Sequence, residues 1–486
     1  MASAVTPATT YETVIGLEVH VQLKTASKLF CPDSTTFGQA PNVNTCTVCL
    51  GYPGALPVLN RQAVEYAIML GLAIHCEIAE VSKFDRKHYF YPDLPKAYQI
   101  SQFDMPLCQH GWMELNSGRR VRILRAHLEE DAGKLVHAGA DGLSGSDYSL
   151  SDLNRAGTPL LEIVSEPDLR SGEEAREYLT QLRNIVRYLG VCDGNLEEGS
   201  MRCDANVSVR PLGEQALGVK AEIKNMNSAR ALQRAIEYEA QRQIELIESG
   251  GRVIQETRLW NEATGVTLSM RGKEGSADYR YFPEPDLRPL VVSREWVERL
   301  RAASPELPHH RFERLTGEFG LSAYDANLLV DVKELGDCFE AAAALTPRYK
   351  TLANWLIGDI TAALKADRRS LADTRLTPQA LAELADLLEE NVISSAIAKK
   401  ILPDVLNDGA LPRVLVESRG LAQVSDTGAL RDLVAAVIAD NPQQVEQYRA
   451  GKDKLLGFFV GQAMKRSKGS ANPELLAPII QAMLAE

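Results

Sequence analysis

Residues 17–23 read LEVHVQL, and this stretch decides how the first half of the chain is organised. Its strict alternation predicts a β-strand with apolar side chains on one face and Glu18, His20 and Gln22 on the other. Because two residues of strand rise only about 7 Å, Glu18 and His20 can converge on one ion or one bound phosphate group. A half-solvated antiparallel strand is the commoner explanation of alternation taken alone.

Two stretches further along place carboxylates in unusual surroundings. HLEEDAGK (127–134) crowds acidic residues together without a helical or strand stripe, and a solvated turn also explains this crowding. In TPLLEIVSEPD (158–168), Glu162 lies inside an apolar run. Burying an ionised carboxylate there is costly unless a cation, a metal or a hydrogen-bond donor compensates it. We therefore predict a functional role for Glu162, whereas periodicity does not separate Glu129 from Glu130.

The stretch SMRCDANVSVRP (200–211) alternates in the same way and predicts a second strand with a polar face. Guanidinium groups bind phosphate oxygens in bidentate fashion, so this face is a candidate cofactor-binding site, although an exposed sheet face explains it equally well. The sequence contains neither a Walker A motif nor GxGxxG. If ATP is used, carboxylate-bound Mg²⁺ and scattered Lys and Arg must hold its phosphates. The polar side chains of this face are those of Arg202, Asp204, Asn206, Ser208 and Arg210.

The eight cysteines are sparse for a chain of 486 residues and indicate a reducing compartment rather than a disulfide framework. Cys31, Cys46 and Cys49 offer three thiolates, and Asp33 could supply the fourth ligand that zinc commonly takes. A lone CxxC pair in a reduced protein is also often just two thiols. The sequence leaves zinc open.

Composition bounds the class of protein. Hydrophobic residues make up 45% and charged residues 24%, which is typical of a globular chain of two to four domains. No apolar run approaches the roughly 18 residues of a membrane span, so we expect a cytoplasmic protein with no membrane contact. The formal charge of −12 argues against a uniform nucleic-acid-binding surface. A local basic patch in the tail is a candidate RNA-binding surface or an ordinary solvated helix face. Its members are Lys452, Lys454, Lys465, Arg466 and Lys468.

Periodicity predicts an α+β protein in three parts. Residues 1–292 mix short β-like segments with helices, one of which should begin at the capping box of Ser171 and Glu174. Residues 293–408 should form an all-helical domain and residues 409–486 a small helical tail. Between the last two, Gly and Pro near residues 402–412 predict a loop.

Nine motifs taken together resemble the GatB family of tRNA-dependent amidotransferase subunits. They are spread over the whole chain and are most specific before residue 290. They read YETVIGLEVHVQL (11–23), NTCTVCLGYPGALPVLN (44–60), FDRKHYFYPDLPKAYQISQ (84–102), HLEEDAGK (127–134), DLNRAGTPLLEIVSEPD (152–168), GSMRCDANVSVRP (199–211), EIKNMNS (222–228), DYRYFPEPDL (278–287) and GKDKLLGFFVGQAMKRSKGSANP (451–473).

The resemblance implies a glutamine-synthetase-like catalytic cradle, a helical domain and a YqeY-like tail that approaches tRNA. It implies Mg²⁺ ligands at Glu18, His20, Glu130 and Glu162. It also implies lysines near an ammonia path at Lys87 and Lys96. At the cysteines the chain departs from the family's Cys-x-Cys pattern, because Asp33 stands where a cysteine is common.

The implied activity is ATP-dependent phosphorylation of the side-chain carboxylate of Glu-tRNA(Gln), Asp-tRNA(Asn) or both, followed by amidation. We find no serine-lysine amidase signature in the sequence, so ammonia should come from a separate glutaminase, GatA, linked through a small third protein, GatC. Two alternatives stay open at this point. One is a tRNA-docking scaffold that does no chemistry, and the other is a free-standing ammonia-dependent ligase of small acids.

Overall fold

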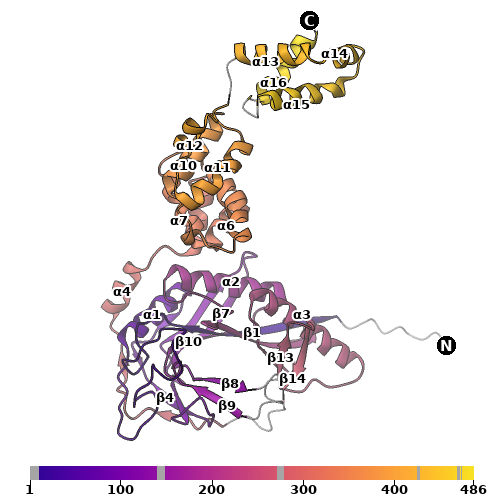
Figure 1. The fold of residues 1–486 in the computed structure, drawn as a ribbon. Coiled ribbons are helices and arrows are strands. Elements are labelled where there is room, and N and C mark those ends of the chain that lie inside the picture. Colours follow the sequence, from indigo (N-terminus) through magenta and orange to yellow (C-terminus); the bar gives the residue numbers. More distant parts are fainter. Residues whose placement is uncertain are drawn as a thin grey trace, which may run out of the picture. The chain divides into compact units, whose positions relative to one another are not determined.

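The computed structural model describes residues 10–138, 148–270, 278–423, 427–467, 471 and 473–485. The chain forms two compact units, Met1–Pro308 and His309–Glu486. Every strand among the described residues belongs to the first unit, and the second unit is built from helices (Figure 1). The boundaries that the sequence predicts at residues 292 and 408 stay predictions.

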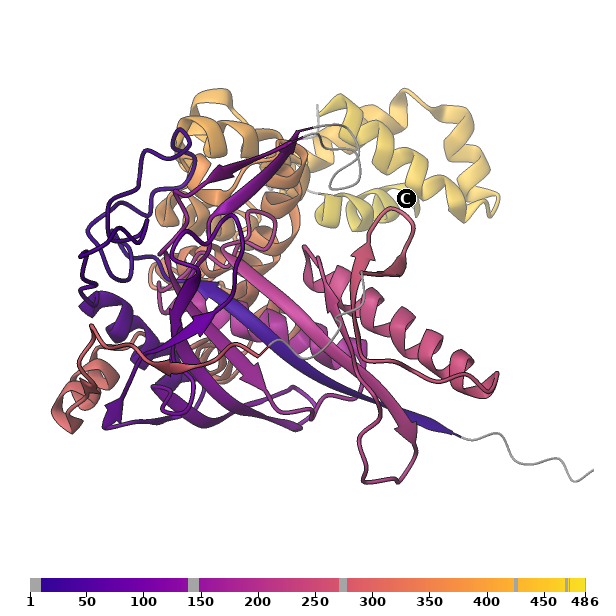
Figure 2. The same cartoon turned by 90° about the horizontal axis from the view of Figure 1, so that it is seen from below.

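A nine-stranded sheet forms the centre of the first unit, in the order β14-β13-β12-β11-β1-β10-β7-β6-β2. All neighbouring strands are antiparallel except β12 and β13, which are parallel. Figure 2 shows β1, in indigo, running through the middle of this sheet. The strands are β1 (Tyr11–Gln22), β2 (Glu77–Ile78), β6 (Cys108–Glu114), β7 (Arg120–Glu130), β10 (Pro159–Ser165), β11 (Met201–Pro211), β12 (Ala221–Lys224), β13 (Glu256–Asn261) and β14 (Val266–Ser269).

Three helices cover one face of the sheet: α1 (Arg61–Ala73), α2 (Gly172–Tyr188) and α3 (Ala229–Glu248) (Figure 1). The apolar side chains of β1 pack into a single core with these helices, and Leu17 and Val19 are fully buried there. As predicted, the hydroxyl of Ser171 accepts a hydrogen bond from the backbone N–H of Glu174 and caps α2. The opposite face of the sheet is left to the polar side chains of β1.

Smaller strands border the polar face. Figure 1 shows β4, β8 and β9 on the side of the sheet away from the three helices. Arg86 in β4 forms a bidentate ion pair with the buried carboxylate of Glu284, at 2.7 and 2.9 Å. These strands are β3 (Val81–Ser82), β4 (Asp85–His88), β5 (Tyr98–Ser101), β8 (Lys134–Ala138), β9 (Tyr148–Asp152), β15 (Phe282–Pro283) and β16 (Leu290–Val291). The first unit ends with α4 (Arg294–Ala303).

The second unit has a succession of short helices, and its last part has a core of its own around Leu430, Phe459 and Ile480. No helix in the described part of the chain is both long enough and apolar enough to cross a membrane. The helical segments are α5 (Pro308–Gly317), α6 (Ala323–Asp331), α7 (Lys333–Ala343), α8 (Tyr349–Trp355), η2 (Leu356–Ile360), α9 (Thr361–Ala366), η3 (Leu371–Asp373), α10 (Pro378–Glu389), α11 (Ser395–Asp408), α12 (Pro412–Arg419), α13 (Thr427–Ala439), α14 (Pro442–Arg449), η4 (Asp453–Leu455), α15 (Leu456–Arg466) and α16 (Pro473–Ala485).

The predicted loop near residues 402–412 is mostly wrong, because α11 continues through Pro403 to Asp408. A proline inside a helix costs about 3 kcal/mol. The buried side chains of Leu402, Val405 and Leu406 offset this cost by packing on one side of the helix. The helix ends at Gly409, which adopts the left-handed conformation with φ 69°.

Candidate functional site

A row of four polar side chains crosses the sheet on the face opposite the three helices. His20 on β1 lies directly opposite Glu162 on β10 and Arg202 on β11, and Glu162 lies opposite His127 on β7. Directly opposed residues of neighbouring strands point their side chains to the same face. Residues far apart in the sequence therefore meet in one row.

Five side chains around this row form what we call the carboxylate–imidazole cluster: Glu18, His20, His127, Glu129 and Glu162. His20 Nε2 lies 3.4 Å from Glu162 Oε2, 3.8 Å from Glu18 Oε1 and 3.7 Å from Glu129 Oε1. His127 Nε2 lies 3.6 Å from Glu162 Oε2 and 3.7 Å from Glu129 Oε2. Three carboxylates thus surround two imidazoles.

The crowding shifts the protonation of the cluster. Burial by itself lowers the pKa of His20, but the hydrogen bond with Glu162 and the charge of Glu129 outweigh burial and raise the pKa to about 9. Burial raises the pKa of Glu162, yet the charges of His127 and His20 hold it well below its usual range. Burial and the neighbouring Glu162 raise the pKa of Glu18. In the absence of a metal, His20 therefore carries a proton at neutral pH.

Lys87 in β4 belongs to the same environment. Burial by itself lowers the pKa of Lys87, but Glu129 and Glu162 outweigh burial and raise it well above its usual range. Its ammonium group also lies 5.0 Å from the ring centroid of Tyr279. Lys87 is thus a fixed positive charge beside the cluster.

Glu130 is separate from the cluster. Its carboxylate accepts hydrogen bonds from Lys96 Nζ and from the backbone N–H of Ile100, the latter at 2.8 Å. The physical reason is strand alternation: Glu129 shares a face of β7 with His127 two residues earlier, whereas Glu130 points the other way. The spacing from His127 to Glu129 was the signal in the sequence that could have distinguished the two glutamates.

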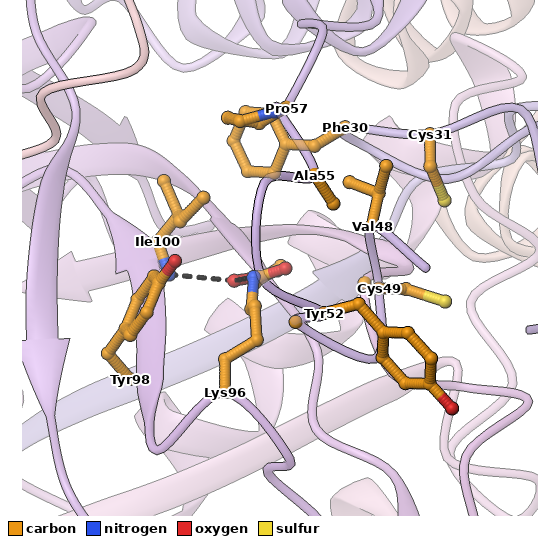
Figure 3. Close-up of a pocket in the computed structure, with 13 residues that line it drawn as sticks. Phe30, Cys31, Val48, Cys49, Tyr52, Ala55, Pro57, Lys96, Tyr98 and Ile100 are labelled. Carbon is orange, nitrogen blue, oxygen red and sulfur yellow. Dashed lines mark hydrogen bonds and ion pairs between the residues drawn. The ribbon is translucent and has the colours of Figure 1, made fainter. Parts of the chain in front are cut away.

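A cavity of about 60 Å³ lies beside the Lys96–Glu130 pair. It has room for at least one molecule of the size of water or ammonia. Figure 3 shows Tyr52, Val48 and Cys49 around it and draws the hydrogen bond made by Ile100. The cavity is therefore bordered by a buried ion pair and by the cysteine-containing loop.

Cys31, Asp33, Cys46 and Cys49, which we call the cysteine cluster, have ligand atoms that all lie within 4.8 Å of one another. Asp33 Oδ2 accepts hydrogen bonds from the thiols of Cys31 at 3.4 Å and Cys49 at 3.2 Å. The hydrogen bond with Cys31 lowers the pKa of Cys49 to about 6, assisted by the nearby charge of Lys28. This is the donor set that the sequence suggested for zinc, and Lys28 adds a buried cation 3.6 Å from Cys49 Sγ that the sequence did not point to.

The polar face of β11 alternates as predicted, but only one end of it lies near the carboxylate–imidazole cluster. Arg202 donates to Asp131 Oδ2 at 2.6 Å, and Asp204 Oδ2 accepts from Lys224 Nζ at 2.7 Å. Arg210 pairs with Glu12 at 2.9 Å. At roughly 3.4 Å per residue, Arg210 lies about 27 Å along the strand from Arg202, and Asn206 and Ser208 lie between them.

The predicted basic patch is exposed at four of its five positions, Lys452, Lys454, Lys465 and Arg466. Arg466 pairs with Asp440 at 2.6 Å, whereas Lys452 donates only to Gln447, at 3.3 Å. Lys468 lies outside the described residues.

Comparison with protein families decides which group of proteins carries this arrangement. Residues 13–298 match the model of the GatB/GatE catalytic domain, and residues 337–484 match the model of the GatB domain. The chain belongs to the GatB family. Both the carboxylate–imidazole cluster and the cysteine cluster fall inside the catalytic-domain match. The four described positions of the basic patch fall inside the second match.

Curated relatives in the GatB family are similar over their whole length. A protein of Synechococcus sp. (strain JA-2-3B'a(2-13)), named as the B subunit of aspartyl/glutamyl-tRNA(Asn/Gln) amidotransferase, is 56% identical over 475 residues, 97% of each chain. A protein of the same name from Trichodesmium erythraeum (strain IMS101) is 54% identical and covers 100% of each chain. One from Geotalea uraniireducens (strain Rf4) is 56% identical over 97% of this chain and 98% of its own. The family and the α+β fold expected from the sequence are confirmed.

Proposed function

We propose that this GatB-family chain is the subunit of a tRNA-dependent amidotransferase that activates the side-chain carboxylate of Glu-tRNA(Gln), Asp-tRNA(Asn) or both. Relatives with this name match the chain from end to end at 54–56% identity. The observation that carries the catalytic role is the carboxylate–imidazole cluster, which gathers five ionisable side chains on one buried sheet face. A docking scaffold has no need for such a costly group of charges.

The reaction runs in two steps. The γ-phosphoryl group of ATP passes to an oxygen of the substrate carboxylate, which breaks the bond to ADP and gives an acyl phosphate. Ammonia then attacks the acyl carbon, phosphate leaves with the electrons of the C–O bond, and the nitrogen releases a proton to give the amide. No nucleophile from the protein is needed, so the chain contributes position and positive charge. Lys87 and Arg202 are the cations next to the cluster that suit this role.

Mg²⁺ is the cofactor that fits the cluster, because carboxylate oxygens are its preferred protein ligands. We propose Glu18, His20 and Glu162 as its ligands, as the resemblance implied. The resemblance gave the fourth position to Glu130, but Glu130 is paired with Lys96, and we give this position to Glu129. A bound Mg²⁺ neutralises phosphate charge during phosphoryl transfer. His20 must give up its proton to bind the metal, so binding releases protons.

The cysteine cluster fits zinc, which accepts four sulfur, nitrogen or oxygen ligands in a tetrahedral arrangement. Three thiol groups and the Asp33 carboxylate provide this set, and Asp33 replaces the sulfur that is common in the family. The positive charge of Lys28 partly balances the four anionic ligands. We propose a structural role for zinc here, since the loop that carries Cys46 and Cys49 also lines the cavity beside Lys96.

We propose that ammonia reaches the carboxylate–imidazole cluster from a partner protein, the glutaminase GatA, held together with this chain by the small protein GatC. The cavity beside Lys96 and Glu130 is large enough for ammonia and is bordered by buried polar groups. Lys87 is on the cluster side of this route. The exposed Lys452, Lys454, Lys465 and Arg466 are the candidate tRNA contacts, together with Lys468.

The test is amide formation by the reconstituted complex. Glu162→Ala should abolish ATP-dependent conversion of misacylated tRNA while the partner glutaminase still hydrolyses glutamine. Normal amide formation by this variant would exclude the proposed site.

The scaffold alternative is tested by tRNA-dependent ATP hydrolysis. Glu18→Gln and His20→Ala should stop ATP hydrolysis while the complex still binds tRNA. If hydrolysis persists in both variants, phosphoryl transfer occurs elsewhere and this chain only docks tRNA. Activity on free glutamate, in place of tRNA, would favour the free-standing ligase.

A further inference from the structure

The carboxylate–imidazole cluster contains more ligands than one divalent cation requires. Two ligand sets, each with atoms within 4.8 Å of one another, share the carboxylate of Glu162. The first set adds Glu18 and His20, and the second adds His127 and Glu129. We propose that the cluster binds two divalent cations, one in each set, with Glu162 shared between them. This inference rests on the proposed function and adds a second ion to it.

The carboxylates are arranged as bridges between the imidazoles. Glu129 directs Oε1 toward His20 Nε2 and Oε2 toward His127 Nε2, both at 3.7 Å. Glu162 Oε2 lies 3.4 Å from His20 Nε2 and 3.6 Å from His127 Nε2. In two-metal sites the ions lie about 3.5–4 Å apart, a separation that a carboxylate with one oxygen on each ion can span. Two glutamates placed between two histidines supply this bridging geometry.

The position of the histidines in the sheet also separates the two sets. His20 and His127 belong to β1 and β7, which flank β10 on either side. Their backbones are therefore about 9.5 Å apart, since neighbouring strands are spaced by about 4.8 Å. Mg²⁺ binds its ligands at about 2.0–2.1 Å in octahedral geometry. Imidazoles that approach Glu162 from opposite strands are better placed to bind one ion each than to share a single ion.

His127 is an independent indication of a ligand. Its side chain is only 3% exposed, and Nδ1 has no hydrogen-bond partner. Its Nε2 points at Glu129 and Glu162 but stays beyond hydrogen-bonding distance of both. Leaving a buried polar group without a partner costs about 1–3 kcal/mol. A cation between Nε2 and the two carboxylates would give this ring the partner that it lacks.

Charge balance favours the second ion. Three glutamates converge here, and a nucleoside triphosphate would add several more negative charges. Lys87 and Arg202 are the nearby cations, and Arg202 is already paired with Asp131. Two divalent cations would balance both the protein carboxylates and the phosphates, and the ion in the second set would lie on the side of the cluster that affects Lys87 through Glu129.

The test counts ions directly, using Mn²⁺ as a paramagnetic probe of the full-length chain. Carboxylate and imidazole ligands suit Mn²⁺, whereas thiolates do not, so the cysteine cluster should not add to the count. We expect two bound Mn²⁺ per chain and an electron paramagnetic resonance spectrum of a spin-coupled pair. One bound ion with an uncoupled spectrum would overturn the second site and leave the proposed function standing. No bound ion would overturn both.

Variants locate the two ions. His127→Ala and the nearly isosteric Glu129→Gln should each reduce the count from two to one and replace the coupled spectrum with that of an isolated ion. Glu18→Gln should remove the other ion. His75→Ala is the matched control, because His75 is exposed, stacks on Trp112 and lies outside the cluster. Two coupled ions in both His127→Ala and Glu129→Gln would overturn the proposal.

Discussion

Replacing Arg86 with alanine tests how strongly the segment around Glu284 is held against β4. The guanidinium of Arg86 makes two hydrogen bonds to Glu284, at 2.7 and 2.9 Å, and a third to Asp286 at 3.3 Å. Glu284 is 3% exposed. Because Arg86 directly precedes Lys87, this ion pair also helps to position the lysine next to the carboxylate–imidazole cluster.

The burial of Glu284 sets the magnitude. Removing one partner of a buried ion pair costs about 3–5 kcal/mol, because the other charge stays buried without compensation. The Arg86 side chain keeps 19% exposure, so we expect a loss at the lower end, about 3 kcal/mol. The guanidinium also lies 4.3 Å from the ring centroid of Tyr98, and losing this cation–π interaction adds about 0.5–1 kcal/mol. The double variant Arg86→Met, Glu284→Leu should recover most of the loss, since it leaves no buried charge.

The assay is denaturant unfolding followed by tryptophan fluorescence in a Trp355→Phe background. The remaining tryptophans then report on the first unit alone. They are Trp112, Trp260 and Trp296.

Arg122→Ala is the control, because it removes an equally well-formed ion pair with Asp168 at 2.7 Å in which the arginine is 67% exposed. Exposed pairs contribute about 0–1 kcal/mol. If Arg86→Ala destabilises the unit no more than Arg122→Ala does, the reasoning about Glu284 is refuted.

Three further outcomes are expected. In chelator, the free energy of unfolding should fall by about 3 kcal/mol as pH rises from about 6.5 to about 9, because folded His20 keeps its proton up to a pKa of about 9 and the unfolded chain loses it near 6.5; Glu162→Gln should flatten this dependence, and an unchanged slope would contradict the account of His20. Asp33→Ala should lower the zinc content of the purified chain by elemental analysis while Asp33→Cys retains it, and equal zinc in both would rule out Asp33 as a ligand. Lys452→Glu and Lys454→Glu should weaken tRNA binding and reduce the slope of log affinity against log salt by about one for each phosphate that is no longer bound, and an unaltered slope would remove these lysines from the RNA surface.

Strand alternation predicted which faces of β1 and β11 are polar, and the structure has Leu17, Val19, Cys203 and Ala205 in the core as that pattern required. The capping box at Ser171 likewise predicted where α2 begins. These predictions succeed because they depend on local geometry: a period of two in strands and the unsatisfied N–H groups at a helix start. The loop predicted near residue 402 fails because Pro403 is tolerated once neighbouring side chains are buried, which is a tertiary effect.

The sequence by itself determined that acidic, imidazole and basic side chains stand on particular strand faces, and motif resemblance indicated the family. It could not determine that β1, β10 and β7 are adjacent and in a register that sets His20, Glu162 and His127 in one row. Register depends on long-range pairing of strands more than a hundred residues apart, and a shift of one residue would turn each side chain to the other face of the sheet. The choice of Glu129 over Glu130, and the isolation of Arg210 from the cluster, were therefore decided only by the tertiary structure.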